Sequence, residues 1–534
     1  MDLFYTRIDS DARSRRAQRA GRFCSAHAFL LLPLVAIILL ADSSWTNAAT
    51  INAKSGSVVD VTAAVAAAGD GDTVSLPSGT STWTSGLTIT KAITLQGAGI
   101  GGTIIKDKVP ADGGLLAFSL VANKASRLTG IEFQNGGRSS QAYNGIIYLV
   151  GANTDSRTMR VDHCKFDHLF GVNINPQDVI GVIDHCTFLS TPTQIPIYVY
   201  DKNWNGQSLS AGSWSDSSHF GTDRFLFIED NTFTFDPGTN YAAVDCYGGA
   251  RWVFRHNTLT NCGLEIHGTE SSGRSRGGRA QEIYENTFIG DGTSGGVLVN
   301  VRSGVALIHD NTASGGIYAK SFHLTTHRMF WNFAPWGSAD GTNPWDVNVP
   351  GGPFYSGKAT GGGTNPGYFS FPSLTVAGNP WTTDQWKGYS IKKTSGAPSN
   401  GSEIETNSSN TITFLNAGGY GPDLSFANGD TFQIYKVTHA MDQPGRSGGP
   451  LVTNDPPSLP TGWNNQVTEP CYEWNNTIVG GGNVDFSPGV LLIRGNEHYF
   501  NGTQAPGYAP YTYPHPLTSG SAHPNPPANL RLGP

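Results

Sequence analysis

Asp245, Glu265 and His267 combine the side chains that acid–base chemistry requires. The two acidic residues occupy equivalent positions in successive repeat units of the chain. If those units stack as parallel strands, the two carboxylates lie about 5 Å apart. Carboxylates at that distance raise the pKa of one partner and so separate an acid from a base. The pair therefore suits glycosidic cleavage or a cation site, with His267 placed to move a proton.

A segment rich in arginine follows these residues. It contains Glu270, Arg274, Arg276 and Arg279 among Gly and Ser, and Arg251 and Arg255 stand on the strand after Asp245. Guanidinium groups bind carboxylates through paired hydrogen bonds, so these side chains predict recognition of an acidic sugar, a uronate. The alternative is that the charged residues form only a solvated surface.

The outward positions of one strand column complete the candidate site. With side chains alternating along each strand, the pairs expected to face water are Asn173 with Asn175, Tyr198 with Tyr200, Asp245 with Tyr247, Glu265 with His267, and Leu298 with Asn300. Tyr198, Tyr200 and Tyr247 are expected to stack on sugar rings. The same alternation places Val244, Cys246, Leu264, Ile266, Val297 and Val299 inside.

A short internal repeat predicts the fold that positions these residues. It reads apolar, two variable residues, Asn or Cys, one variable residue, apolar, and it occurs at Val161–Phe166, Ile183–Phe188, Ile228–Phe233, Phe254–Leu259, Ile283–Phe288 and Ile308–Ala313, with a weaker copy ending at Asn475–Ile478. One unit is too short to bury its own apolar face, so it must stack on its neighbours. Asn suits the bend because it tolerates a left-handed backbone, and a column of Asn can hydrogen-bond between coils.

A second strand is expected before each copy of the repeat. These strands are predicted at 172–175, 197–200, 244–247, 264–267, 297–300 and 317–320. A short amphipathic helix at 60–68 is expected to cap the open N-terminal end, because terminal coils of a solenoid need a cover. The predicted fold is all-β: a parallel β-helix with a helical N-terminal cap.

The first predicted coils carry a resemblance to known proteins. Gly71–Pro77, Leu87–Ile89 and Ile93–Gly97 look like the opening of pectate-lyase-like, single-stranded right-handed parallel β-helix proteins, and the repeated Asn-Thr-Phe units are similar to theirs. The resemblance covers about residues 55–330 and 465–515. It is specific for the fold and carries little information about the reaction.

The resemblance also implies a chemistry. In polysaccharide lyases of this fold, an arginine abstracts the C5 proton while calcium neutralises the uronate, which here suggests Arg276 or a neighbouring arginine as the base and calcium as the cofactor. Two motifs of such proteins are absent: the Arg-x-Pro-x-x-Arg stretch of pectate lyases, and the adjacent Asp pair with Gly-His-Gly of polygalacturonases.

The repeat divides the chain into segments. We expect an export signal at 1–48, the β-helix with its cap at 49–334, an insertion at 335–460 with a small β-module at about 372–437, final coils at 461–500, and a Pro-rich tail at 501–534. Trp381 and Trp386 of the module are expected to pack in its own core, with a sugar-stacking platform as the alternative. The tail is expected to lie along the solenoid or to cover its last coil.

The N-terminal segment and the charge suggest where the protein acts. A basic stretch followed by an apolar run at 28–41 and small residues at Ala48 and Ala49 is typical of a signal peptide, with an uncleaved anchor as the alternative. We therefore expect secretion, or retention at the cell surface or in the periplasm, and no stable membrane span after cleavage. A formal net charge of −7 argues against nucleic acid as a partner.

Cysteine usage argues against a disulfide framework. Cys24 falls in the signal, which leaves five cysteines, and no CxxC spacing occurs. Cys164 and Cys186 take the Asn position of the repeat and are expected to stack as buried thiols.

The sequence favours a carbohydrate-active protein that cleaves an acidic polysaccharide by β-elimination along an elongated groove. Two alternatives are a glycoside hydrolase of the same fold and a non-catalytic glycan-binding or adhesion protein, and a structural spacer without ligand is a further one. In each of the first three cases the expected partner is a polysaccharide or another glycan.

Overall fold

The computed structural model describes residues 48–110, 113–151, 159–192, 194–238, 242–269, 276–290, 296–315, 318–363, 370–396, 401–416, 424–449, 458, 466–480 and 484–519. Residues 1–47 of the predicted signal segment, Glu270 and Arg274 lie outside the described residues. Within the described part, no helix has the length and apolar character needed to cross a membrane.

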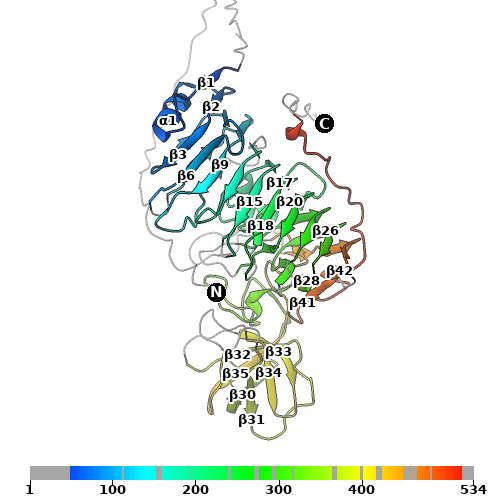
Figure 1. Cartoon of the computed structure of the whole chain (residues 1–534). Helices are drawn as coiled ribbons and strands as arrows, with labels where there is room; N and C mark the ends of the chain where they lie inside the picture. Colours follow the sequence, from blue (N-terminus) through cyan, green and yellow to red (C-terminus); the bar gives the residue numbers. More distant parts are fainter. Residues whose placement is uncertain are drawn as a thin grey trace, which may run out of the picture.

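Three parallel sheets form the body of the molecule, and each coil contributes one strand to each sheet (Figure 1). Sheet A runs β1 (Thr50–Asn52), β2 (Thr73–Ser75), β5 (Thr94–Gln96), β8 (Ser126–Thr129), β11 (Met159–Asp162), β14 (Gly181–Asp184), β17 (Leu226–Glu229), β20 (Arg251–Arg255), β23 (Ala280–Tyr284), β26 (Val305–His309), β39 (Cys471–Trp474) and β42 (Tyr499–Phe500). Sheet B runs β3 (Gly79–Trp83), β6 (Thr103–Asp107), β9 (Glu132–Asn135), β12 (Lys165–Asp167), β15 (Thr187–Ser190), β18 (Thr232–Phe235), β21 (Thr258–Thr260), β24 (Thr287–Ile289), β27 (Thr312–Ser314) and β40 (Thr477–Ile478). Sheet C runs β4 (Leu87–Ile89), β7 (Leu116–Ser119), β10 (Ile147–Val150), β13 (Ile174–Gln177), β16 (Ile197–Tyr200), β19 (Ala242–Tyr247), β22 (Gly263–Ile266), β25 (Gly296–Val301), β28 (Tyr318–Leu324) and β41 (Phe486–Pro488). Because parallel crossovers are right-handed in nearly all proteins, this is the right-handed parallel β-helix that the sequence predicts.

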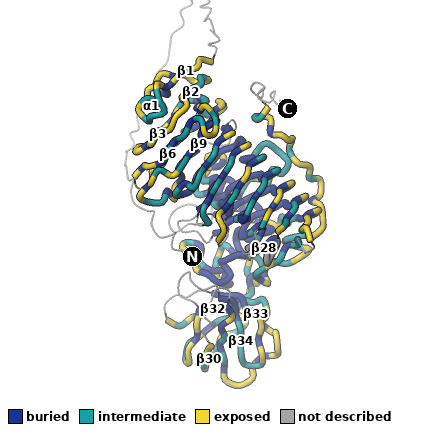
Figure 2. The backbone as a smooth tube through the Cα atoms, in the orientation of Figure 1, coloured by how far each residue is buried: buried dark blue, intermediate teal, exposed yellow. Residues whose placement is uncertain are grey.

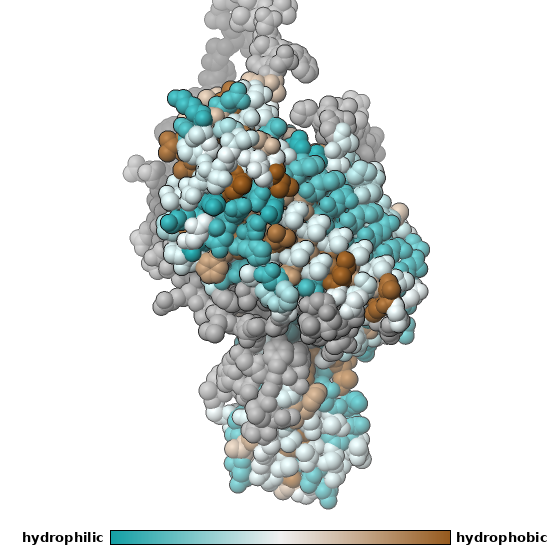
Figure 3. Space-filling view, viewed as in Figure 1, coloured by the Kyte–Doolittle hydropathy of each residue, from teal (hydrophilic) through white to brown (hydrophobic). Residues whose placement is uncertain are grey.

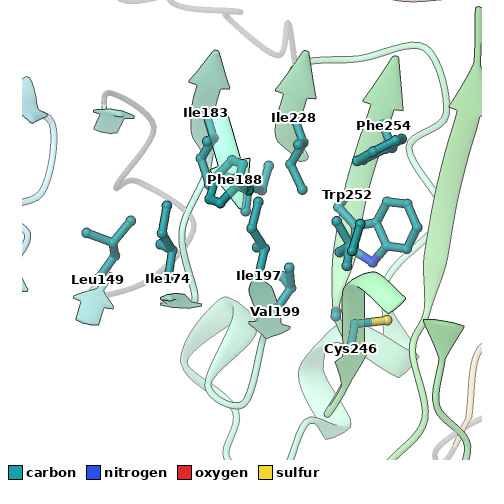
Figure 4. Close-up of a cluster of buried hydrophobic side chains, with 14 of the residues drawn as sticks. Leu149, Ile174, Ile183, Phe188, Ile197, Val199, Ile228, Cys246, Trp252 and Phe254 are labelled. Atoms are coloured by element: carbon teal, nitrogen blue, oxygen red, sulfur yellow. The ribbon is translucent and has the colours of Figure 1, made fainter. Parts of the chain in front are cut away.

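The core lies between the three sheets. Equivalent residues of successive coils stack directly, as in the column Phe166, Phe188 and Phe233, whose ring centroids are 4.7 Å apart at each step. Figure 4 shows side chains from the sheets meeting in the interior, among them Ile183, Ile197 and Trp252. Each coil thus buries its apolar face only by contact with the next coil, which is the packing of a solenoid.

The bend from sheet A to sheet B carries the predicted asparagine column. Asn257 accepts the backbone N–H of Asn231 at 2.9 Å, and its own amide donates to Ile228 O and Arg255 O at 2.9 Å each. The same pattern links Asn286, Asn311 and Asn476. The hydrogen bonding from coil to coil is therefore confirmed.

The expectation that the asparagine itself takes the left-handed backbone is wrong. The residues with positive φ, between 49 and 57°, are those just before it: His163, His185, Asp230, His256, Glu285, Asp310 and Asn475. Turning the chain one residue earlier leaves the asparagine side chain directed inward, where it can bond both neighbouring coils. Cys164 and Cys186 continue this column as buried free thiols, as predicted.

Helix α1 (Val58–Ala67) lies at the first coils and buries Val61, Ala64 and Val65 in the main core. Ser57 begins it, because the Ser57 side chain accepts the N–H of Asp60. That α1 covers the open N-terminal end of the core stays a prediction.

The segments inserted into the solenoid lie in the connections that run from sheet C to sheet A. Between β16 and β17 lie the turn η1 (Trp204–Gly206) and α2 (Ala211–Ser215). Between β28 and β39 the chain forms η2 (His327–Met329), the pair β29 (Val347–Asn348) with β36 (Val437–His439), the pair β37 (Arg446–Ser447) with β38 (Val467–Thr468), and a closed antiparallel barrel of β30 (Tyr355–Gly363), β31 (Ser373–Val376), β34 (Thr411–Phe414), β33 (Gly401–Asn407), β32 (Ser390–Lys393) and β35 (Thr431–Tyr435).

The barrel has a core of its own, which Figure 2 shows as buried segments inside an exposed outer surface. Trp381 and Trp386 belong to that core with 5 and 7 % of their surface exposed, so the expectation of internal packing is confirmed. Glu403 joins the barrel to the last coils by accepting the N–H groups of Leu491 and Leu492.

The described part of the C-terminal tail lies along sheet A, as predicted, and includes the turn η3 (Pro516–Thr518) (Figure 1). Arg255 donates to the carbonyls of Tyr511 and Thr512, while Arg160 donates to those of Leu517 and Thr518. On the face in Figure 3, hydrophobic residues form small separate spots among hydrophilic ones.

Candidate functional site

The outward face of sheet C carries the residues that the sequence singles out. One row across the strands contains Tyr198, Asp245, Glu265, Asn300 and His323. Tyr198 is paired with Asp245, and Glu265 is paired with Asn300. Because Val244 opposes Leu264, the next residues, Asp245 and Glu265, stand on adjacent coils. We call these residues the sheet C row.

Part of the sheet C row is buried, which contradicts the expectation that it faces water, whereas Glu265 and Asn300 are half-buried. Asp245 is completely buried, and Tyr198 and Tyr200 expose 4 and 6 % of their surface. Asn173 and Asn175 are equally buried. Leu298 differs further: the register shifts between Gly296 and Val297, so Leu298 belongs to the main core while Val297 is only half-buried.

Asp245 and His267 form a close pair. The Nδ1 atom of His267 lies 2.6 Å from Oδ1 of Asp245, and the N–H of Cys246 donates to the same carboxylate oxygen at 2.7 Å. Burial raises the pKa of Asp245 to about 8, against the opposing charge of Arg302. Since Asp245 engages Nδ1, proton transfer by His267 has to use Nε2.

Glu265 has a different partner. Nε of Arg302 lies 2.7 Å from Oε1 of Glu265, and the amide of Asn300 donates to both carboxylate oxygens at 3.0 and 3.1 Å. Burial raises the pKa of Glu265, and Arg302 again opposes this shift. The two acidic residues are therefore not a bare carboxylate pair: one is held by an imidazole and the other by a guanidinium.

Three tyrosines border the Asp245–His267 pair. The rings of Tyr200 and Tyr247 are 4.3 Å apart edge to face, and Tyr198 lies 5.3 Å from Tyr247. The ring of Tyr247 is 6.5 Å from that of His267. Burial raises the pKa of Tyr247 to about 12, so its hydroxyl keeps its proton at ordinary pH.

The predicted arginines bind groups in other segments of the chain. Arg276 is fully buried and binds both carboxylate oxygens of Asp442, in the insertion, at 2.7 Å. Arg251 donates to Ser213 and to the carbonyls of Asp216, Ser217 and Ser218. Arg279 lies 3.2 Å from a carboxylate oxygen of Glu469. With its guanidinium bound by Asp442, Arg276 is poorly placed to act as a base.

Arg302, His323 and His327 are members of this site that the sequence analysis did not assign to it. Nη1 of Arg302 lies 3.3 Å from Nδ1 of His327, and Nδ1 of His323 lies 3.2 Å from Oδ1 of Asn300. A signal was present for Arg302, because it follows Asn300 at the same two-residue spacing by which His267 follows Glu265.

Calcium as a cofactor stays a prediction for the described residues. Their one cluster of metal-binding type is His439, Glu497 and His498. Calcium prefers oxygen ligands, whereas this cluster has one carboxylate, which Arg494 already binds through two hydrogen bonds of 2.7 Å. In addition, Nδ1 of His498 accepts the backbone N–H of Arg494, so a neutral His498 carries its proton on Nε2. At the sheet C row, Arg302 lies 2.7 Å from Oε1 of Glu265 and already supplies a positive charge there.

Replacing Asp245 with Asn should stabilise the fold increasingly as the pH rises. The unfolded carboxyl ionises near pH 4 and the folded one near 8, so between these values unfolding releases a proton and wild-type stability falls with rising pH. The amide does not ionise. We expect Asp245→Asn to gain at least about 1 kcal/mol over wild type across this window, the value of one pKa unit. Denaturant titrations at pH 5 and pH 8 measure it, and a constant difference would contradict it.

Comparisons with known proteins give distant likenesses. No family model matches the sequence, and no curated protein is detectably similar to it. Among solved structures, ORF18 of Geobacillus virus E2 is 15 % identical, with 71 % of this chain and 79 % of that chain covered and a TM-score of 0.25. The A-module of the mannuronan C-5 epimerase AlgE6 of Azotobacter vinelandii is 15 % identical, with 50 and 92 % covered and a TM-score of 0.21. A tailspike protein mutant of E. coli bacteriophage HK620, solved with a pentasaccharide, is 10 % identical, with 68 and 86 % covered and a TM-score of 0.24. The β-helix architecture itself follows from this chain's own strand pairing.

Proposed function

We propose that this chain is a carbohydrate-active enzyme that removes the C5 proton of a uronate residue and cleaves an acidic polysaccharide by β-elimination. The observation that carries the proposal is the Asp245–His267 pair on the outward face of sheet C. A carboxylate that engages Nδ1 fixes the orientation of the imidazole and leaves Nε2 for proton transfer, the arrangement that general bases use.

Each side chain then has a role in the elimination. His267 Nε2 takes the C5 proton, the electron pair of that bond forms the C4–C5 double bond, and the C4–O bond breaks. Tyr247, which keeps its proton, donates it to the leaving oxygen. Arg302 supplies positive charge near the uronate carboxylate, where negative charge develops in the transition state.

The pH dependence follows from the shared proton of the pair. Burial raises the pKa of Asp245 to about 8, so below that pH a protonated Asp245 donates to Nδ1 of His267 and the ring then carries its proton on Nε2, which blocks the base. We expect kcat/KM to rise about tenfold per pH unit below 8 and to level off above. Initial rates on a uronate polymer between pH 5 and 10 test this, and a profile that falls over this range would contradict it.

A panel of acidic polysaccharides tests the reaction itself. Ultraviolet absorbance from an unsaturated uronate supports elimination, and the assay is run with calcium and with a chelator. We expect activity to survive chelation, because Arg302 already supplies a positive charge at Glu265. Loss of cleavage in the presence of the chelator would instead support the calcium requirement that the family resemblance suggests.

Hydrolysis is the second candidate, and one observation favours it. A carboxyl with a pKa of about 8 is protonated at neutral pH and can act as an acid, with Glu265 on the adjacent coil. New reducing ends without ultraviolet absorbance would support it. Binding without any cleavage would support the adhesion function.

We further propose that the protein acts after export, which the N-terminal sequence of the mature protein tests.

A further inference from the structure

Two buried asparagines next to the candidate site have amide atoms without partners. Asn173 has neither its Oδ1 nor its Nδ2 hydrogen-bonded, and Asn175 lacks a partner for Oδ1, although each side chain exposes only 1 % of its surface. Native proteins leave few buried polar atoms unpaired, because each one costs stability. Two adjacent amides of this kind on one strand end therefore suggest a ligand.

Asn175 continues the sheet C row toward the N-terminus, and Asn173 precedes it by two residues. Asn175 is paired with Tyr148 of β10, and the β13–β16 register places it opposite Tyr198. Tyr198 in turn is paired with Asp245, whose Oδ2 also has no hydrogen-bond partner. Asn175 thus lies two coils, or about 10 Å, from Asp245.

The row changes its chemistry along this direction. From Asp245 toward the C-terminus it is charged, with Glu265 and Arg302 as an ion pair. Toward the N-terminus it consists of amides and phenol rings. An amide both donates to and accepts from hydroxyl groups, and aromatic rings pack against the apolar face of a sugar. The spacing of coils, about 4.8 Å, is close to the length of one pyranose residue.

We infer that Asn173 and Asn175 form a sugar-binding subsite, which holds the hydroxyl groups of a glycan residue about two to three units away from the one at His267. The inference rests on the proposed function in placing the reacting residue at His267. Both amides are covered in this structure, so the bound sugar has to displace what covers them. The subsite makes binding depend on the length of the glycan chain.

The test measures binding and stability of the full chain. In an Asp245→Asn background, calorimetry compares uronate oligosaccharides of two and of four residues, with Asn175→Leu and Asn173→Leu as variants. Each variant is expected to weaken binding of the tetrasaccharide about tenfold and to leave the disaccharide unchanged. The melting temperature should stay the same or rise, because no hydrogen bond is lost. The matched control is Asn52→Leu, an exposed strand asparagine of the first coil.

Two results would overturn the inference. One is unchanged tetrasaccharide affinity in both variants, and the other is a fall in melting temperature, which would assign the amides to internal structure. Neutral oligosaccharides of four residues separate this inference from the proposed function. If uronates neither bind nor react but a neutral tetrasaccharide binds wild type and not Asn175→Leu, the subsite stands and the lyase proposal fails. If neither class binds wild type, the subsite fails as well.

Discussion

Replacing His267 with Gln is expected to lower kcat for uronate cleavage by about 10²- to 10⁴-fold, the usual contribution of a general base. The glutamine amide can still reach the carboxylate of Asp245, which lies 2.6 Å from the imidazole in the wild type, but it has no basic nitrogen. KM should change little, because the substrate is held mainly by other side chains of the face. Steady-state kinetics with the ultraviolet assay measure the loss.

A second His–Asp pair of this chain is a matched control for that experiment. Nδ1 of His168 lies 2.5 Å from Oδ1 of Asp167, at the end of β12 in sheet B. The variant His168→Gln should leave kcat within about twofold of wild type. Equal losses of kcat in the two variants would show that the Asp245–His267 pair has no special role. A fully active His267→Gln variant would show that His267 is not the base.

Replacing Asn257 with Ala is expected to destabilise the β-helix by about 3 kcal/mol or more. The side chain accepts the N–H of Asn231 and donates to Ile228 O, Arg255 O and Oδ1 of Asn286. Alanine leaves these buried groups unpaired, and each costs about 1–3 kcal/mol. Denaturant unfolding followed by circular dichroism measures the change.

The neighbouring residue offers the comparison for this substitution. Thr258 begins β21 at the same bend and is only half-buried, so Thr258→Ala should cost under about 1 kcal/mol. If Asn257→Ala is no more destabilising than Thr258→Ala, then the asparagine column does not hold the coils together.

Much of the β-helix could be predicted from the sequence because its information is local and repeated. The hexapeptides at Val161–Phe166 and Ile183–Phe188 set the bend and the inward phenylalanines, and each coil repeats that constraint. The left-handed residue was predicted one position too late in the chain, because Asn and the Asp or His before it both tolerate that backbone conformation. His163 and Asp230, not the asparagines, take it.

The surroundings of the candidate site could not be predicted to the same extent. The pairing of Arg276 with Asp442 joins residues 166 apart in the sequence, and no repeat connects the insertion to the coil that it meets. Burial of the sheet C row likewise depends on segments outside the strand pattern. His267 was expected next to Asp245 and Glu265, but its hydrogen bond to Asp245 on the preceding strand could not be predicted, because His267 lies beyond the end of β22 and outside the strand pattern.

Release of hydrogen from C5 of the uronate tests the central claim most directly. A uronate polymer labelled with tritium at C5 is incubated with wild type and with Asp245→Asn, and the label in water is counted. We predict that wild type releases the label in step with the unsaturated product and that Asp245→Asn releases it at least about 100-fold more slowly. Bond cleavage by the wild type with the label retained at C5, or release at the wild-type rate by the variant, would contradict the assignment of His267 and Asp245.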